Sequence, residues 1–312
     1  MSDLLLSIAE VSDDMKDTSG LAMFAPSASS KLMGNLTNAD CELIYTNPDY
    51  SVPFKLFIAD TKSTEKYQKK IQNDKGYNKL LRDILQDETQ KESLRFTFLM
   101  NVDDYAAGDI PSLEKLTDSK NSSDIMKANA LRILKRVDKD KGNIHVVKIL
   151  QNVNQYSEPE VTVSLDTLGN STDQTAIING NEDEIDLIND AIKQTTNKHI
   201  IESAIFALAH FKNEKSVATV LENRSKVNDD YAIRFYVDRN YAVVANMLSS
   251  KDDSVVNNAL TCVEITPFKN FLPKIIELRT SATNNETKSR LINLISLINS
   301  GKLERNVKFD KQ

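Results

Sequence analysis

Glycine, proline and cysteine are scarce in this chain, and each shortage excludes a class of structure. Of the 312 residues only 8 are glycine and 7 are proline, so few positions suit the tight turns that join short β-strands. The two cysteines, Cys41 and Cys262, are far apart in the sequence and indicate neither a disulfide framework nor a thiolate metal cluster. A mainly helical protein in a reducing compartment is therefore expected.

Positive net charge and long apolar runs are also missing. The formal net charge is −6, which argues against general attraction to nucleic-acid phosphates or to anionic lipid. No apolar run approaches the roughly 18 residues that a membrane span requires. The N-terminus carries Asp3 and has no basic region of the kind that begins a secretory signal. We expect a soluble protein of the cytoplasm without membrane contact, with partners that are proteins in preference to nucleic acid.

The motifs of familiar catalytic and cofactor sites are absent too. The chain has no glycine-rich phosphate loop and no G-x-S-x-G nucleophile turn. His199 and His210 are eleven residues apart, which on a single helix separates them by about 16 Å and prevents them from sharing a metal. The stretch at 138–143 lacks the ligands of a calcium loop, and the acids at 182–186 are typical of the start of a helix. No catalytic residue, cofactor or metal site is predicted.

One pattern recurs instead, in which an acid is followed by a β-branched pair, a small residue and a leucine. It is clearest at 253–263, where Ala259 follows Asp253 by six positions and is small enough for a neighbouring helix to approach closely. Aligning the chain on this pattern gives seven anchor positions, spaced by 27 to 40 residues, which suits a helical hairpin with two turns. The anchors are Ser93, Ala130, Ser164, Ala204, Ala232, Ala259 and Arg290.

The residue six positions before each anchor is expected at the start of the second helix of a hairpin. These residues are Asp87, Asp124, Glu158, Lys198, Lys226, Asp253 and Asn284. An acid or asparagine there can accept hydrogen bonds from the free N–H groups of the helix, whereas the two lysines have no such role. Each turn follows an apolar first helix, and these helices are expected near Leu80, Leu113, Val146, Ile185, Val217, Val243 and Leu272.

This unit resembles the repeats of HEAT-like and armadillo-type α-solenoid proteins. The stretches at 253–263 and 271–278 match best a leucine-rich first helix, an acidic turn and a second helix with Val-x-x-Ala-x-x-x-Leu. The resemblance covers residues 78–300 and implies a mainly α fold of about seven stacked helical hairpins. The arginine that such repeats carry three residues before the anchor is mostly absent, and Lys127 is the nearest instance.

The segments on either side of the repeats are irregular. Residues 1–77 are expected to form an N-terminal extension made of an amphipathic helix at 2–16, a loop at 18–40, a small β-hairpin at 41–59 and a lysine-rich segment at 62–77. The apolar face of the first helix, with Leu4, Leu5 and Ile8, packs either on the protein's own body or on a partner. Residues 301–312 are expected to form a tail that either caps the last helix or forms a short extended hook, and the cationic residues of the tail favour capping.

Three arginines stand two residues after an anchor, namely Arg95, Arg132 and Arg234. If the second helices line one face of an array, these guanidinium groups form a partial ladder suited to carboxylates or phosphates of a partner. Alternatively they pair with neighbouring acids such as Asp166, which has the same position in its own repeat. The sequence leaves both interpretations open.

The repeats favour a non-catalytic protein-binding or assembly scaffold, such as a structural subunit of a larger complex. One alternative is a HEAT-like enzyme that resembles small-molecule lyases or DNA glycosylases. The other is a solenoid that binds nucleic acid through the lysine-rich segment. Negative net charge and the absence of tryptophan disfavour the glycosylase.

Overall fold

The protein is mainly helical, as its composition predicts. A computed structural model describes residues 37–49, 75–90, 92–101, 105–169, 182–227, 230–301 and 303. All regular structure in these ranges is helical, with no β-strand. The chain divides into two compact units, a first unit at residues 1–112 and a second unit at residues 113–312, and each is described by itself.

The first unit contains three described helices that pack in chain order. They are α3 (Asn38–Thr46), α6 (Lys75–Gln86) and α7 (Glu92–Asn101), followed by the short turn η2 (Ala107–Asp109) and the beginning of α8 (Ile110–Thr117). Helix α3 contacts α6, and α6 contacts α7. Buried apolar side chains from all three helices, Cys41, Ile44, Ile84, Leu85 and Leu99, belong to the core. The predicted end of the extension at residue 77 lies within α6.

The first strand of the predicted hairpin at 41–59 is wrong, because residues 41–45 belong to helix α3. Thr37 and Asp40 form a capping box, in which Asp40 donates its backbone N–H to Thr37 Oγ1 at 3.2 Å and accepts the N–H of Thr37 at 2.7 Å. This arrangement satisfies free N–H groups at the start of a helix. Asn47 ends α3 because the following proline disfavours helical backbone. The predicted loop at 18–40 is wrong at residues 38–40, because these residues form the first turn of helix α3. Residues 50–59, 1–36 and 62–74 lie outside the described ranges.

An ion pair joins α6 to η2 within the first unit. Arg82 donates two hydrogen bonds to the carboxylate of Asp109, one of them from Nη2 to Oδ2 at 2.8 Å. The same carboxylate accepts the backbone N–H of Ala106 at 2.9 Å. Burial alone raises the pKa of Asp109, but the bonds from Arg82 and Ala106 outweigh it and hold that pKa below its ordinary value.

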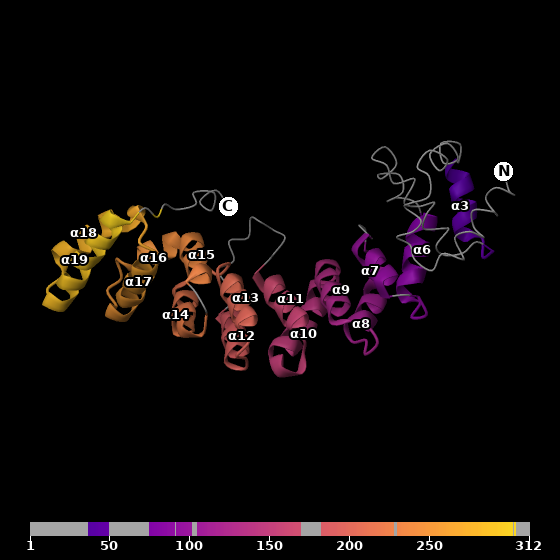
Figure 1. Ribbon diagram of the computed structural model, residues 1–312, viewed down its shortest axis with the longest axis horizontal. Helices are drawn as coiled ribbons and strands as arrows, with labels where there is room; N and C mark the ends of the chain where they lie inside the picture. The colour runs from indigo at the N-terminus through magenta and orange to yellow at the C-terminus, as the bar shows by residue number, and fades with distance from the viewer. Residues whose placement is uncertain are drawn as a thin grey trace. The chain divides into compact units, whose positions relative to one another are not determined.

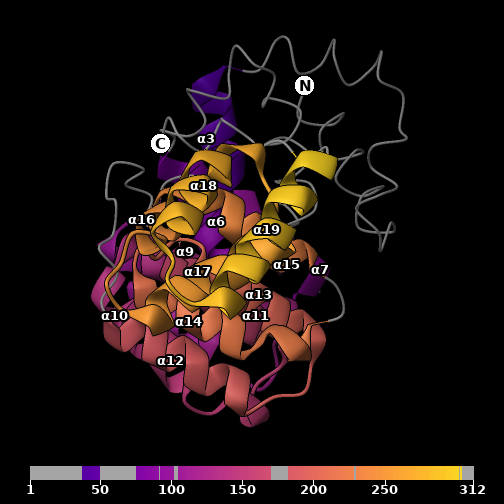
Figure 2. The ribbon, with the colours of Figure 1, turned by 90° about the vertical axis from the view of Figure 1, so that its left-hand side faces the viewer.

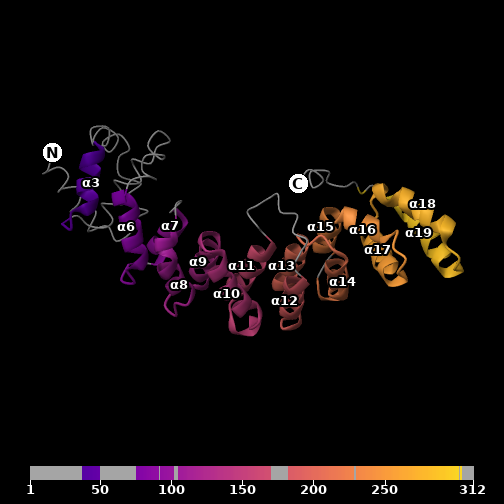
Figure 3. The same cartoon turned by 180° about the vertical axis from the view of Figure 1, so that it is seen from behind.

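The second unit is a succession of short helices. They are α9 (Asp124–Val137), α10 (Lys139–Leu150), α11 (Glu158–Gly169), α12 (Glu182–Lys193), α13 (Lys198–Leu208), α14 (Glu214–Glu222), α15 (Tyr231–Arg239), α16 (Tyr241–Met247), α17 (Asp253–Ile265), α18 (Leu272–Ser281) and α19 (Asn285–Ser300). Figures 1 and 3 show, from opposite sides, that these helices follow one another in chain order.

Two series of contacts run through this unit. Helix α9 contacts α11, α11 contacts α13, and the same relation continues through α15, α17 and α19. In the other series α10 contacts α12, α12 contacts α14, and α14 contacts α16. We refer to α9, α11, α13, α15, α17 and α19 as the odd-numbered helices. Each of them is the predicted second helix of a hairpin.

The small anchor residues of five odd-numbered helices are buried. The five anchors Ala130, Ser164, Ala204, Ala232 and Ala259 are each at most 2% exposed. A side chain of this size lets a neighbouring helix approach closely, and the recurring position in the sequence corresponds to a recurring buried position in the helices.

The N-terminal caps of α9, α13 and α17 lie one residue before the helix starts that the repeat pattern predicts. Ser123, Asn197 and Asp252 accept the backbone N–H groups that open α9, α13 and α17. The neighbouring acids Asp124 and Asp253 are therefore first-turn residues, where the helix dipole favours negative charge.

The prediction that Lys226 starts a second helix is wrong. This lysine lies in the short turn η4 (Arg224–Lys226), and α15 begins only at Tyr231. By contrast, Asn284 caps α19 as predicted and accepts the N–H of Glu286 at 2.8 Å.

Arg290 replaces the small anchor in the last odd-numbered helix, and it joins α19 to α17. Its Nε and Nη2 atoms donate to the two carboxylate oxygens of Glu264 at 2.7 and 3.0 Å, and Nη1 donates to Asn257 Oδ1 at 3.1 Å. Figure 2 views this pair of helices from the α19 end. The exposed residues of α19 include the polar Asn285, Ser289, Asn293, Ser296 and Asn299 and the apolar Ile292 and Leu297.

Candidate partner-binding surface

The three candidate arginines have different surroundings. Arg95 lies in the first unit, is only 4% exposed, and donates from Nε to the backbone oxygen of Leu85 at 3.0 Å. Its guanidinium therefore satisfies a helix carbonyl within its own unit and does not take part in an exposed ladder. The other candidates, Leu4, Leu5 and Ile8, lie outside the described residues.

Arg132 is exposed on α9 and pairs with an acid on the next odd-numbered helix. Its Nη2 atom is 3.3 Å from Asp166 Oδ2, and Nη1 is 3.5 Å from Asn129 Oδ1. The side chains of Arg132 and Asp166 are 50% and 47% exposed. The pairing with Asp166 that the sequence offered as an alternative is present. Such an open ion pair contributes at most about 1 kcal/mol, so it leaves Arg132 able to exchange partners.

Arg234 is exposed on α15 beside an aromatic cluster. Its backbone N–H donates to the backbone oxygen of Asp230 at 2.7 Å, whereas its side chain makes no hydrogen bond or ion pair with another described residue. Tyr231 is 66% exposed, and its ring lies edge-on to Phe206 of α13 with centroids 6.2 Å apart. Phe235 meets Phe206 in the same way at 5.2 Å. Aromatic side chains beside an arginine are enriched at protein interfaces, which makes this part of the odd-numbered helices a candidate contact surface.

A groove lies between α9 and α11 on the same series of helices. Its volume is about 260 Å³, and it is open to solvent. The residues that line it are Ile125, Ala128, Asn129 and Arg132 of α9 and Glu158, Pro159, Thr162 and Val163 of α11. The sequence did not indicate this groove, because it depends on the sizes of side chains in two helices that are far apart in the chain.

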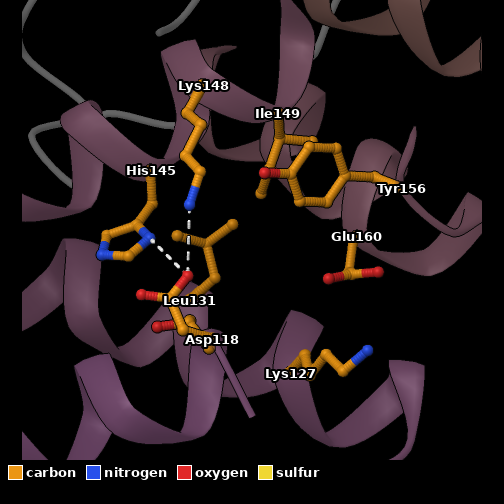
Figure 4. A pocket seen from close by; sticks show the side chains of 9 residues that line it. Asp118, Lys127, Leu131, His145, Lys148, Ile149, Tyr156 and Glu160 are labelled. Carbon is orange, nitrogen blue, oxygen red and sulfur yellow. Dashed lines mark hydrogen bonds and ion pairs between the residues drawn. The ribbon is translucent and has the colours of Figure 1, made fainter. Parts of the chain in front are cut away.

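A second, smaller cavity holds a polar cluster and is too small for a substrate. In Figure 4 the carboxylate of Asp118 faces Lys148 and His145. Its Oδ1 atom is 3.3 Å from Lys148 Nζ and 4.0 Å from His145 Nδ1. Asp118, and then Tyr156, raise the pKa of Lys148 above its ordinary value. The cavity volume is about 10 Å³, which is room for about one water molecule. This geometry suits a structural ion pair at the surface of α10.

Two partly buried lysines bind the ends of neighbouring odd-numbered helices. Lys135 of α9 donates to the backbone oxygen of Thr167 in α11 at 2.5 Å, and Lys212, after α13, donates to that of Arg239 in α15 at 2.6 Å. Burial lowers the pKa of both lysines to about 8; Glu184 opposes this change at Lys135, whereas Arg239 adds to it at Lys212. We refer to Lys135 and Lys212 as the lysine ties.

The histidines and cysteines show no reactive arrangement in the described ranges. Burial, and then the nearby charge of Arg239, lower the pKa of His210 to about 4, so it stays neutral. His199 is exposed on α13. Both cysteines are buried, and burial raises the pKa of Cys262 to about 12. Among these residues no group of three or more His, Cys, Asp or Glu side chains is placed to hold a metal ion.

The polar stretches that the sequence singled out have structural roles. Asp138 caps α10 and accepts the N–H of Lys141 at 3.0 Å, as expected of a polar turn. Asp186 in the acidic start of α12 pairs with Lys215 at 2.8 Å. In the residues of known placement, no helix has both the length and the apolar character needed to cross a membrane.

Comparison with known proteins adds no relative: no family model matches the chain, and no curated protein or solved structure is similar to it.

Proposed function

We propose that this chain is a non-catalytic protein-binding or assembly scaffold built as a HEAT-like α-solenoid. The observation that carries the proposal is the repeated contact from each odd-numbered helix to the next, with a small anchor buried in α9, α11, α13, α15 and α17. Repeats that contact mainly their neighbours give an extended surface, and proteins of this kind use that surface for binding.

The odd-numbered helices offer the features that a protein partner would contact. They carry the groove between α9 and α11, the exposed Arg132 and Arg234, and the aromatic side chains around Tyr231. Arginine and aromatic residues account for much of the binding energy at protein interfaces. On the other series of helices, Ile144 of α10 is an exposed apolar residue, and the aromatic Tyr241 of α16 packs on the buried Phe271.

The proposal is tested by purifying the tagged full-length chain under gentle conditions and cross-linking it to the chains that accompany it. We expect a stoichiometric partner whose cross-links map to the odd-numbered helices. Tyr231→Asp should weaken the complex, whereas Ile144→Asp should not. The two residues form a matched pair because they are 66% and 67% exposed. A monomer without any partner, shown by light scattering and mass spectrometry, would contradict the scaffold function.

A further inference from the structure

The groove between α9 and α11 has a small, apolar floor. Ala128 and Val163 line it and are 1% and 8% exposed, so they form its base. Ile125 stands on its α9 side and is 56% exposed. Because the floor is made of short side chains, the space of about 260 Å³ remains open to an apolar side chain from outside.

The two ends of the groove differ in charge, because one end holds the ion pair of Arg132 with Asp166 and the other holds Glu158. Arg132 pairs with Asp166, and Lys135 reaches Thr167, so the later parts of α9 and α11 lie together. Arg132 therefore marks the C-terminal end of the groove. Glu158 is the first residue of α11 and marks the N-terminal end.

Arg132 has donors to spare. Charge-assisted bonds between a guanidinium and a carboxylate are commonly about 2.7–2.9 Å long, whereas its contacts to Asp166 and Asn129 are 3.3 and 3.5 Å. The planar guanidinium presents several N–H groups in a fork that fits a carboxylate with two parallel bonds. A further carboxylate can thus bind Arg132 without any rearrangement of the helices.

We propose that this groove binds a segment of a protein partner in which an apolar side chain is followed by a carboxylate. The apolar side chain rests on Ala128 and Val163, and the carboxylate binds Arg132. A singly charged carboxylate fits better than a phosphate, because Asp166 and Glu158 already place negative charge at the site. The inference rests on the proposed scaffold function and specifies the partner's chemistry.

A random peptide library displayed on phage and selected against the full-length chain provides the test. We expect the selected peptides to share a leucine-like residue followed closely by Asp or Glu. Arg132→Glu should weaken the binding of a labelled selected peptide about tenfold or more, as measured by fluorescence anisotropy. Thr162→Phe, which fills the groove from the α11 side, should weaken it as well.

Arg136→Glu is the matched control. Arg136 is exposed on α9 one turn beyond Arg132 and does not line the groove, so the same change of charge there should leave binding unchanged. A peptide whose acid is replaced by lysine should regain affinity for the Arg132→Glu variant, which a general loss of structure could not produce. Circular dichroism of each variant confirms that it is folded.

Several results would overturn this inference. One is a library that yields no peptide, or only peptides without an acid. A selected peptide that binds Arg132→Glu and Arg136→Glu equally, or that binds more tightly when its acid is replaced by phosphoserine, would also contradict it. A change of oligomeric state in Arg132→Glu would make a second copy of the chain the occupant. If a partner co-purifies but its cross-links avoid the groove, the scaffold function stands and only the groove's assignment fails. If no partner exists at all, the scaffold function itself fails.

Discussion

Arginine is used differently in the two units of the chain. In the first unit Arg95 is buried against a helix carbonyl and Arg82 binds the buried Asp109. In the second unit Arg132 and Arg234 are exposed on the odd-numbered helices. Arg95, Arg132 and Arg234 share one position relative to their anchors, so position within the repeat does not decide the role. Burial by the surrounding chain decides it.

The largest effect is expected from breaking the pair between Arg82 and Asp109. The side chain of Asp109 is 6% exposed, so Asp109→Ala leaves a partly buried guanidinium without its carboxylate and should lower the free energy of unfolding by about 3 kcal/mol. Urea denaturation followed by circular dichroism measures the loss. Asp166→Ala, which removes the exposed partner of Arg132, is the matched control and should cost less than about 1 kcal/mol. Equal losses would remove the distinction between the units.

A somewhat smaller effect is expected from enlarging an anchor in the second unit. Ala204 of α13 is fully buried, and Ala204→Leu should lower the free energy of unfolding by about 1–3 kcal/mol because the surrounding core must move to admit the larger side chain. Ala218→Leu makes the same change at an exposed position of α14 and should change stability by less than about 0.5 kcal/mol. If the two variants unfold at the same urea concentration, Ala204 is not a packing contact.

The helical elements were largely predictable, because helix period and small anchor residues are local properties of the sequence. The anchors at Ala130, Ala204 and Ala259 are buried, and the predicted apolar first helices coincide with α6, α8, α10, α12, α14, α16 and α18. Helix α3 was missed because its apolar and β-branched residues resemble a strand, whereas the capping box of Thr37 and Asp40 selects a helix.

The candidate surface was predictable only in part. The sequence identified Arg132 and its pairing with Asp166, because both share a repeat position on neighbouring helices. It could not distinguish the buried Arg95 from the exposed Arg234, since exposure depends on how the surrounding chain packs. The lysine ties were missed for a similar reason: Lys135 stands at the end of a helix, but the carbonyl that it binds belongs to the next repeat.

Both units are expected to gain stability as the pH rises, but in different pH ranges, acidic for the first unit and alkaline for the second. The lowered pKa of Asp109 means that its stabilising contribution is present at neutral pH and is lost as the pH falls through that lowered value. For the lysine ties the pKa falls from 10.5 to about 8 on folding. Between these two pH values the unfolded chain binds more protons, so the ties make stability rise with pH from about 8 to about 10.5.

Melting temperatures of variants, measured from pH 8 to 10.5, isolate the contribution of the lysine ties to the pH dependence of stability. A double variant, Lys135→Met with Lys212→Met, should show a smaller rise from pH 8 to 10.5 than the unchanged protein. Lys274→Met, at a lysine that is 44% exposed, should keep the full rise and is the matched control. An identical rise in all three proteins would show that the ties do not titrate in this range.

The smallest effect on stability is expected where the effect on binding is largest. Arg132→Ala removes an open ion pair and should change the free energy of unfolding by less than about 1 kcal/mol, because both side chains are about half exposed. The same substitution should release a partner that binds the odd-numbered helices, as measured by co-purification of the tagged chain. Arg95→Ala should do the reverse, lowering stability by leaving the Leu85 carbonyl without its buried donor while sparing the partner. Loss of the partner in Arg95→Ala under conditions where the second unit stays folded would place the binding surface in the first unit instead.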